Sequence, residues 1–250
     1  EFKGIKVIEM GDLYSHNYFQ TFCNLSLLNP LKYIYYIESV LVKKLEKNIF
    51  TNFDKIILFS KNEIKKINNT FRKKIFYINL SVDSIHNKFS FSKKNNRILF
   101  IGNLGYLPNL LAVKDFIKNI LPTLRKKIPN IQFYVVGNIS KINRFLLYFH
   151  RNVIFVGQKD NLKNYIKKSF CGLANLKIAT GIQGKVLTYM SYGLPVICSN
   201  KVSFNFDNSV MNYKNNVELL KKILSLKNNK QLSKSLSKRS LAFVKKLNSD

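Results

Sequence analysis

The sequence predicts an α/β fold, because short apolar segments alternate with longer amphipathic ones along most of the chain. A second observation supports this class. Three of the apolar segments end at a glycine: Arg97–Ile101 before Gly102, Ile131–Val136 before Gly137, and Val153–Val156 before Gly157. Strands separated by helix-length segments need crossover connections, which produce a parallel sheet covered by helices on both faces. We therefore expect a doubly wound, Rossmann-like domain from residue 97 onward.

Each element of that domain follows from the same alternation. The expected strands are residues 97–101, 131–136, 153–156, 170–174 and 195–198, and the expected helices are residues 109–127, 140–149, 160–168, 183–192, 214–227 and 230–247. Asp160 lies at the start of the third of these helices and is expected to cap it. Gly193 follows the fourth and is expected to end it, before Pro195 starts the next strand.

Residues 1–85 predict part of a second α/β domain. The expected elements are strands at residues 5–8, 55–59 and 75–78, a long helix at 30–50 and a short helix at 61–68. Glu38 and Glu46 are expected on the polar side of the long helix. Three strands make a small sheet, so we expect the early strands of this domain to precede the first residue. Residues 86–96, which are polar and end in Lys-Lys-Asn-Asn, are the expected linker to the domain at 97–250.

The composition describes a globular chain with a strong positive charge. The 250 residues are 46% hydrophobic, which excludes a disordered protein, and no stretch approaches the ~20 apolar residues of a membrane span. Thirty-six lysines and six arginines against thirteen acidic residues give a net charge of +29. This charge favours phosphate-bearing partners, but Lys with Asn, Ile and Phe is also what an A/T-rich coding sequence produces. Because arginine, the usual reader of guanine and phosphate, is scarce, no nucleic-acid partner is expected.

Cysteine and histidine give no sign of a disulfide framework or a metal site. Cys23, Cys171 and Cys198 are widely spaced, and the two later ones lie in apolar segments, where we expect small core side chains. The three histidines are equally far apart and form no helical metal-binding pair. We therefore expect no metal, no cofactor and a reducing compartment.

Three segments follow expected strands, at the sheet edge where open parallel sheets bind ligands. In the first, Gly102 and Gly105 precede a helix that starts near Pro108. Such glycines let backbone N–H groups and a helix N-terminus approach an anion, and a simple turn is the alternative. In another, Gly157 and Gln158 form a loop that either touches a nucleobase or only leads into the next helix.

The most informative segment runs from Thr180 to Cys198. Gly181 and Gly184 free the backbone at the N-terminus of an apolar-periodic helix, and Lys185 adds a positive charge in its first turn. A lysine opposes the helix dipole there unless an anion lies between them, and a diphosphate would satisfy both. The alternative is a solvated lysine at an ordinary helix start.

Taken in order, these segments resemble the donor-binding C-terminal domain of GT-B glycosyltransferases, in the large group called family 4 or glycosyl transferases group 1. Three pieces carry the resemblance: G-N-L-G-Y-L-P-N-L-L-A-V-K-D-F followed by I-L-P; V-V-G followed by F-V-G-Q-K-D; and G-I-Q-G-K-V-L-x-x-M-x-x-G-L-P-V-I. Upstream, Met10–Ser15, Glu38–Glu46, Ser60–Glu63 and Asn79–Asp83 resemble the later half of the N-terminal, acceptor-side domain of these enzymes. The resemblance therefore implies a GT-B fold in which the N-terminal domain lacks its first part.

The resemblance also implies roles for single residues. Donor and diphosphate binding fall to Gly102, Asn103, Gly181, Gln183, Gly184, Lys185 and Thr188. Asp12 lies where relatives often place a polar or histidine residue near the reacting sugar, and His16, one helical turn away, is the second catalytic candidate. Such enzymes generally need no metal, because basic side chains and a helix N-terminus neutralise the leaving diphosphate.

Three positions depart from the family pattern, the first being Gln183, which stands where many relatives carry a second basic residue. Thr188 stands where the family usually has the carboxylate that binds the donor ribose, and Thr180 stands where it has another glutamate. A hydroxyl can still bond a ribose but loses the charge-assisted strength of a carboxylate, a difference of about 1 kcal/mol. The alternative to an active transferase is therefore a degenerate GT-B-like module that binds a nucleotide or acts as a partner subunit.

The expected function is transfer of a sugar, of the hexosyltransferase type, from a nucleotide-diphosphate sugar to a saccharide or lipid-linked acceptor. The expected setting is surface polysaccharide or glycoconjugate synthesis in the cytoplasm. The Lys-rich segment 214–247 has leucines at helical spacing, which favours peripheral contact with the anionic inner face of a membrane. An exposed helix pair packed on the sheet is the alternative for that segment.

Overall fold

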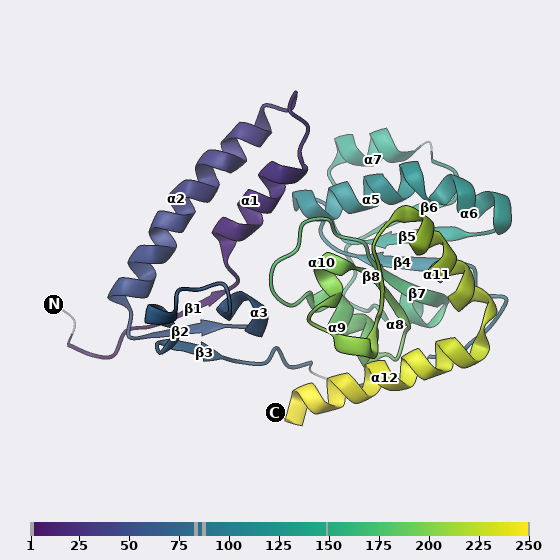
Figure 1. The fold of residues 1–250 in the computed structure, drawn as a ribbon. Coiled ribbons are helices and arrows are strands. Elements are labelled where there is room, and N and C mark those ends of the chain that lie inside the picture. Colours follow the sequence, from purple (N-terminus) through teal and green to yellow (C-terminus); the bar gives the residue numbers. More distant parts are fainter. Residues whose placement is uncertain (1–2, 83–84, 87–88, 149, 250) are drawn as a thin grey trace. The chain divides into compact units, whose positions relative to one another are not determined.

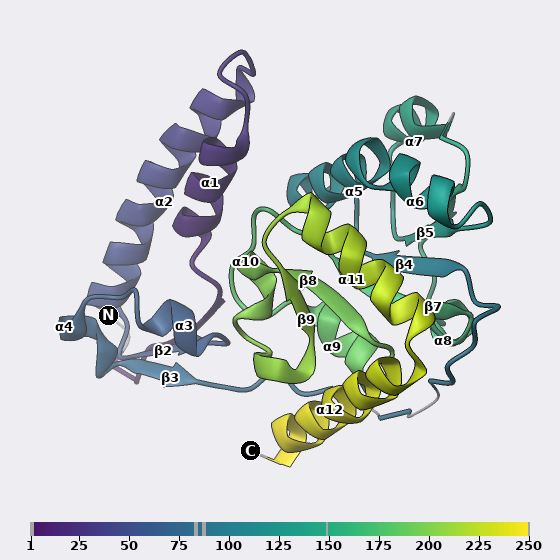
Figure 2. The same cartoon turned by 45° about the vertical axis from the view of Figure 1, so that its right-hand side comes forward.

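The computed structural model describes residues 3–82, 85–86, 89–148 and 150–249. The chain forms two compact units, which are drawn in Figures 1 and 2. Unit 1 comprises residues 1–80 and 178–183, and unit 2 comprises residues 81–177 and 184–250. A short segment from the C-terminal half of the chain therefore belongs to unit 1. The expected boundaries at 85 and 96 stay a prediction, and residues 83, 84, 87 and 88 near them lie outside the described residues.

Unit 1 is built on a three-stranded parallel sheet in the order β1-β2-β3. Its strands are β1 (Val7–Gly11), β2 (Lys55–Leu58) and β3 (Ile75–Tyr77). Its helices are α1 (Tyr14–Asn24), α2 (Leu31–Asn52), α3 (Lys61–Ile64) and α4 (Asn69–Arg72). All three strands were predicted, although β1 begins two residues later than expected. The helix expected at 61–68 is a single turn, α3.

Helix α1 was not predicted, because its sequence is rich in aromatic and polar residues of modest helix propensity. Packing against α2 stabilises it, and the two helices lie side by side in both views (Figures 1 and 2). The rings of Phe22 and Tyr36 join them at 5.1 Å between centroids. Nζ of Lys32 also donates hydrogen bonds to the carbonyl oxygens of Phe22 and Leu25, at 2.8 Å each, at the C-terminal end of α1.

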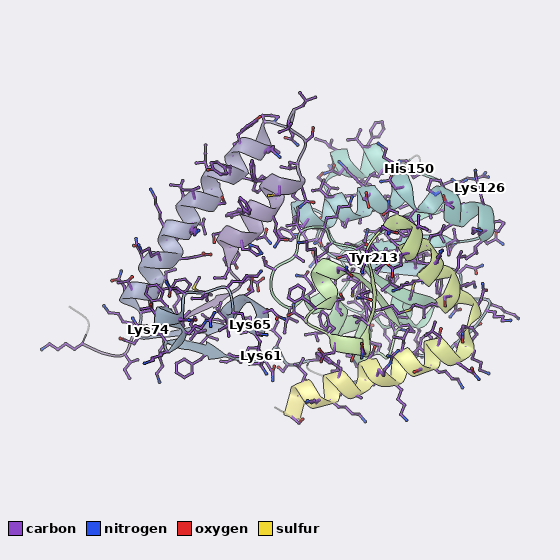
Figure 3. The ribbon with its side chains drawn as sticks, in the orientation of Figure 1. Lys61, Lys65, Lys74, Lys126, His150 and Tyr213 are labelled. Atoms are coloured by element: carbon purple, nitrogen blue, oxygen red, sulfur yellow. The ribbon has the colours of Figure 1, made fainter. Side chains whose placement is uncertain are left out.

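A buried carboxylate corrects the expectation for α2. Glu46 was expected on the polar side of this helix, but it is only 5% exposed. Its oxygens accept hydrogen bonds from the backbone N–H of Ser15, at 3.0 Å, and from the Ser15 hydroxyl. Backbone N–H groups in the first turn of a helix lack helical partners, so Glu46 caps α1 from a neighbouring helix. Lys74, labelled in Figure 3, donates in the same way to three carbonyl oxygens at the C-terminal end of α2.

Unit 2 contains a six-stranded, all-parallel sheet in the order β6-β5-β4-β7-β8-β9. Its strands are β4 (Arg97–Ile101), β5 (Gln132–Val136), β6 (Val153–Gly157), β7 (Ser169–Ala174), β8 (Val196–Ser199) and β9 (Met211–Tyr213). The doubly wound prediction is confirmed, since the order runs outward from β4 in both directions. Cys171 and Cys198 are fully buried, as expected. The three-residue edge strand β9 was too short to predict.

The remaining elements of unit 2 are helical. They are α5 (Leu107–Asn119), α6 (Leu121–Lys127), α7 (Lys141–Tyr148), α8 (Lys163–Lys167), α9 (Gly184–Ser191), α10 (Asn200–Ser203), the 3-10 turn η1 (Asp207–Ser209), α11 (Asn216–Asn228) and α12 (Lys230–Ser249). The segment 109–127 is two helices rather than one, because Pro122 cannot continue the hydrogen bonding of α5. Asp160 does not cap α8, because the neighbouring Asn161 accepts the N–H of Lys163 at 3.0 Å instead. Within the described ranges, no helix has the length and apolar character needed to cross a membrane.

The strand order reverses between β4 and β7, whose last paired residues are Leu99 and Gly172. Beyond this pair, Tyr189 of α9 lies between the two strands. Its hydroxyl accepts the N–H of Ile101 at 2.6 Å and donates to the carbonyl oxygen of Leu173 at 3.4 Å. A Cβ on Gly172 would lie 2.5 Å from the Tyr189 ring, so this position requires glycine. Helix α9 is thereby anchored at the point of an open sheet where ligands bind.

Candidate functional site

Lys185 forms the first part of the candidate site. It is the second residue of α9, and its Nζ lies over the ring of Phe100, 4.5 Å from the centroid. It donates a hydrogen bond to Oδ1 of Asn109, in the first turn of α5. The side chain therefore reaches from the N-terminus of α9 to the end of β4. Burial of the ammonium group lowers the pKa of Lys185 to about 7, because both contacts are neutral and do not replace the lost hydration of the charge.

The loop after β4 packs tightly against this lysine. Nδ2 of Asn109 donates to the carbonyl oxygen of Asn103 at 2.8 Å, and Oδ1 of Asn103 accepts the N–H of Gly105 at 2.9 Å. A Cβ on Gly102 would lie 2.9 Å from Nδ2 of Asn109 and 3.1 Å from Nζ of Lys185. A larger residue at 102 would therefore displace the side chains of Asn109 and Lys185 from these positions.

The N-terminus of α9 is open. A Cβ on Gly184, the first residue of the helix, would meet no heavy atom within 4 Å. The hydroxyl of Thr188, one turn further on, donates to the carbonyl oxygen of Gly184 at 3.0 Å. Its oxygen can still accept a hydrogen bond from a ligand. The backbone N–H groups of the first turn lack helical partners, so an anion can approach them beside Lys185.

The candidate nucleobase loop follows β6, at the same carboxyl edge of the sheet. Gly157 ends this strand with a φ of +82°, a conformation that favours glycine. Its carbonyl oxygen accepts the N–H of Gly137, which follows β5, at 2.9 Å. Gln158 is exposed. The loops after β4, β5 and β6 therefore form one continuous rim.

The segment 178–183 holds further predicted residues, and its contacts lie within unit 1. Gly181 has a φ of +58°, and a Cβ there would lie 1.7 Å from Oδ1 of Asp12. The hydroxyl of Thr180 donates to Oδ2 of Asp12 at 3.4 Å and accepts from Nδ2 of Asn17 at 3.1 Å. Nε2 of Gln183 donates to the carbonyl oxygen of Thr180 at 2.9 Å. The structure thus brings Asp12 together with the segment that leads into α9.

Asp12 also belongs to a pair of carboxyl groups, of which Glu63 is buried and Asp12 is half-buried. Oε2 of Glu63, in α3, accepts the N–H of Leu13 at 3.3 Å. Burial and the negative charge of Asp12 raise the pKa of Glu63 to about 7, and burial raises the pKa of Asp12 as well. Oε1 of Glu63 lacks a donor among the described residues, a position that a proton shared with Asp12 satisfies. Near neutral pH this pair can hold a proton, as a general acid or base must.

The surroundings of His16 differ from those of Asp12 and Glu63. It is in the first turn of α1 and lines a cavity of about 670 Å³ inside unit 1, together with residues of α2 and of the segment from α3 to α4. Asp12 is not among the residues of its wall. The two catalytic candidates therefore have different environments, one beside a carboxyl group and one beside a cavity.

Neither the contacts of Lys185 nor those of Asp12 and Glu63 bring together the side chains that a metal ion needs. In the part of the chain that the structure describes, no group of three or more His, Cys, Asp or Glu side chains is placed to hold a metal ion.

Sequence reasoning missed three residues of these arrangements: Asn109, Glu63 and Tyr189. Asn109 lies inside the first motif, and an amide in the first turn of a helix after a glycine turn was a usable signal. Glu63 bonds a residue 50 positions away, and Tyr189 bonds one 88 positions away. Neither has a local pattern that reveals its partner.

Comparisons with known proteins agree with the fold. An uncharacterized 44.6 kDa protein from the cps region of Klebsiella pneumoniae is 28% identical over 110 residues, which are 43% of this chain and 27% of that protein. The crystal structure of TarM from S. aureus has a TM-score of 0.66 at 15% identity, over 82% of this chain and 42% of TarM. HepE from Anabaena, crystallised with UDP and glucose, has a TM-score of 0.68 at 12% identity, over 97% of this chain and 69% of HepE.

At these identities the solved structures show a shared fold, and the chain spans about a quarter of the Klebsiella protein and less than half of TarM. A family model described as glycosyl transferases group 1 matches residues 95–229, more than half of the chain. These residues contain β4 to β9 and all three motifs of the resemblance. The chain belongs to the glycosyl transferases group 1 family and has the GT-B fold.

Proposed function

We propose that the chain transfers a sugar from a nucleotide-diphosphate donor and that unit 2 binds the diphosphate. Lys185 carries this proposal. Its ammonium group is buried against neutral partners, beside an open helix N-terminus, where the strand order reverses. A diphosphate would accept hydrogen bonds from both the ammonium group and the helix N–H groups. HepE and TarM were crystallised with UDP, so a uridine nucleotide is the first candidate.

In this mechanism the residues of unit 2 stabilise the leaving group. Lys185 and the N-terminus of α9 supply positive charge where the diphosphate becomes more negative, so we expect transfer to proceed in the presence of a chelator. Gly102 and Asn103 shape the loop beside the phosphates. Thr188 accepts a hydrogen bond from a ribose hydroxyl, and the loop at Gly157 and Gln158 contacts the base.

In unit 1, Asp12 acts near the reacting sugar, and Glu63 holds the proton that determines its charge. His16 is the second candidate for this task, because it lines a cavity that an acceptor can enter. An Asp12→Asn variant that keeps nucleotide binding and loses transfer supports the first assignment, whereas unchanged transfer moves the assignment to His16.

A binding experiment tests the donor site. UDP, GDP and ADP are added separately while thermal unfolding is followed, and a nucleotide at a hundred times its Kd stabilises the protein by about 2.7 kcal/mol. We expect one nucleotide to raise the melting temperature and Lys185→Met to abolish the shift. Lys201→Met is the matched control, because Lys201 is exposed and is likewise the second residue of a helix, α10. If none of the three nucleotides stabilises the wild-type protein, the donor site is refuted.

A second function is favoured by the two threonines. The Thr180 hydroxyl is bonded to Asp12 and Asn17, and the Thr188 hydroxyl donates to its own helix, so neither position supplies a carboxylate to the donor ribose. We propose as the alternative a degenerate module that binds the nucleotide without turnover. The assay measures release of the nucleoside diphosphate from a nucleotide sugar in the presence of a mixture of saccharide acceptors. Such release excludes this alternative.

The wider role is also a proposal. The name of the Klebsiella relative places it in a cps region, and we propose that this chain serves surface polysaccharide or glycoconjugate synthesis at the cytoplasmic side of the membrane. Helices α11 and α12 carry the lysines that would contact anionic lipid. Recovery of the protein in the membrane fraction at low salt and its release at high salt is the expected result.

A further inference from the structure

Unit 1 contains a cavity of about 670 Å³ of which the proposed function uses one residue, His16. We infer that this cavity binds an amphiphilic anion, namely a lipid-linked phosphate or diphosphate, with its apolar chain against an aromatic wall and its phosphate at a group of lysines. The identity of this ligand as the acceptor rests on the proposed function, whereas its binding can be measured separately.

One face of α2 forms the long wall of the cavity. Its lining residues include Tyr36, Val40, Lys43, Lys47 and Phe50, which recur at intervals of three and four. Residues at this spacing lie on one face of a helix. The cavity therefore follows a single stripe along α2 that changes from apolar to cationic and back to apolar.

Three apolar side chains of the wall are exposed, as are apolar side chains of α2 outside the cavity, such as Ile37 and Leu45. Phe19 of α1 is 46% exposed, and Tyr36 and Val40 of α2 are 48% and 41% exposed. Below them Phe50 and Ile67 form the floor and belong to the buried core of unit 1. Large apolar side chains that surround a cavity gain free energy when an apolar chain displaces water from them. This wall fits a hydrocarbon or isoprenoid tail.

The cationic part of the wall comes from Lys43, Lys47 and Lys66. Lys43 and Lys47 are both exposed and stand four residues apart on α2, where like charges destabilise a helix unless an anion lies between them. A phosphate or diphosphate meets that requirement. The combination of an apolar wall and adjacent lysines selects a ligand that has both a tail and an anionic group.

Glu46 also lines the cavity, and its charge has to be accounted for. Both of its oxygens accept hydrogen bonds from Ser15, at the positive end of α1. Its negative charge is therefore already stabilised inside unit 1. The phosphate is accordingly assigned to the exposed lysines of the wall and not to the neighbourhood of Glu46.

The test measures binding of farnesyl diphosphate below its micelle-forming concentration by calorimetry. Inorganic diphosphate and farnesol serve as the two halves of the ligand. We expect farnesyl diphosphate to bind at least about tenfold more tightly than either half, which corresponds to 1.4 kcal/mol. All of these measurements are made in the Lys185→Met background, because the proposed donor site in unit 2 would itself bind a diphosphate, whereas the cavity lies in unit 1.

Two matched pairs of variants locate the binding. Lys43→Glu and Lys47→Glu, made one at a time, are each expected to weaken binding about tenfold, while Lys44→Glu, an exposed neighbour outside the cavity, changes it less than about twofold. Val40→Asp is expected to weaken binding, while Leu41→Asp is not, because Leu41 is 52% exposed and does not line the cavity. All five positions are exposed, so these substitutions leave the core of unit 1 intact.

Two results overturn the inference. Equal losses in the cavity variants and their neighbours show general attraction to a basic surface, such as that of a membrane. Inorganic diphosphate that binds as tightly as farnesyl diphosphate shows an anion site without recognition of a tail. Nucleotide binding of the wild-type protein is measured in parallel. If a nucleotide binds and farnesyl diphosphate does not, this inference alone is refuted. If farnesyl diphosphate binds and no nucleotide does, the donor site alone is refuted.

Discussion

The two units place opposite charges at the same topological position. In unit 1 the carboxyl ends of β1 and β2 lead to Asp12 and Glu63, whose pKa values are raised. In unit 2 the carboxyl end of β4 meets Lys185, whose pKa is lowered to about 7. Burial is the largest cause of all three shifts. In both units the parallel α/β architecture places ionisable side chains at the carboxyl ends of strands, and the sign of each side chain's charge determines whether burial raises or lowers its pKa.

The largest expected effect contrasts two glycines three residues apart, one in each unit. Gly181→Ala forces a non-glycine residue to a φ of +58° and into Asp12, so we expect it to destabilise unit 1 by about 3 to 4 kcal/mol. Gly184→Ala adds a methyl group to open space at a helix start and is expected to change stability by less than about 0.5 kcal/mol. Urea unfolding of both variants measures the difference, and equal midpoints would contradict the assignment of Gly181 to unit 1.

Glu63→Gln tests the carboxyl side of the comparison through the pH dependence of stability. The folded pKa of Glu63, about 7, lies above its unfolded value of 4.5. The stabilisation from its proton is therefore complete below pH 4.5 and is lost as the pH rises to about 7, a change of about 3 kcal/mol. We expect the variant to lose this slope and to exceed the wild type in stability at pH 8. Glu38→Gln, on the exposed side of α2, is the control and keeps the wild-type curve.

Asn109→Asp tests the lysine side by placing a carboxylate against Lys185. The new charge raises the pKa of Lys185, pairs with its ammonium group and repels a diphosphate. We expect nucleotide affinity to fall about thirtyfold, or about 2 kcal/mol. Asn138→Asp is the control. It adds the same charge in the adjacent loop, where Asn138 is exposed. Similar losses in both variants would show that the general field, and not the contact with Lys185, determines affinity.

The smallest expected effect is the proton uptake that accompanies nucleotide binding. Because Lys185 has a pKa of about 7 and a bound diphosphate favours its charged form, the Kd for nucleotide is expected to rise about fivefold from pH 7 to pH 8. The terminal phosphate of a nucleotide is already ionised in this range, since such groups have a pKa of about 6. Lys185→Arg keeps its charge at both pH values and should remove the dependence. A wild-type Kd that is constant across this range would contradict the lowered pKa.

Local patterns in the sequence predicted most elements of unit 2 and the residue at the centre of the candidate site. Apolar runs that end in glycine located β4, β5 and β6 to within a residue or two, and the glycines before α9 singled out Lys185. The contacts of Lys185 with Phe100 and Asn109 depend on the strand order, which local periodicity does not encode. The same reason explains why α1, stabilised by packing on α2, and Glu63, paired across the sheet end with Asp12, were missed.

The hydroxyl of Tyr189, between β4 and β7, limits how helix α9 can move. If α9 slid or rotated, the N–H of Ile101 and the carbonyl oxygen of Leu173 would lose their shared hydroxyl, at a cost of about 1 to 3 kcal/mol for each buried group left unpaired. Helix α9 is thereby tied to both strands, and we expect the Ile101 amide to exchange slowly with solvent. The segment just before Gly184, residues 178–183, belongs to unit 1 and is not held by this hydroxyl.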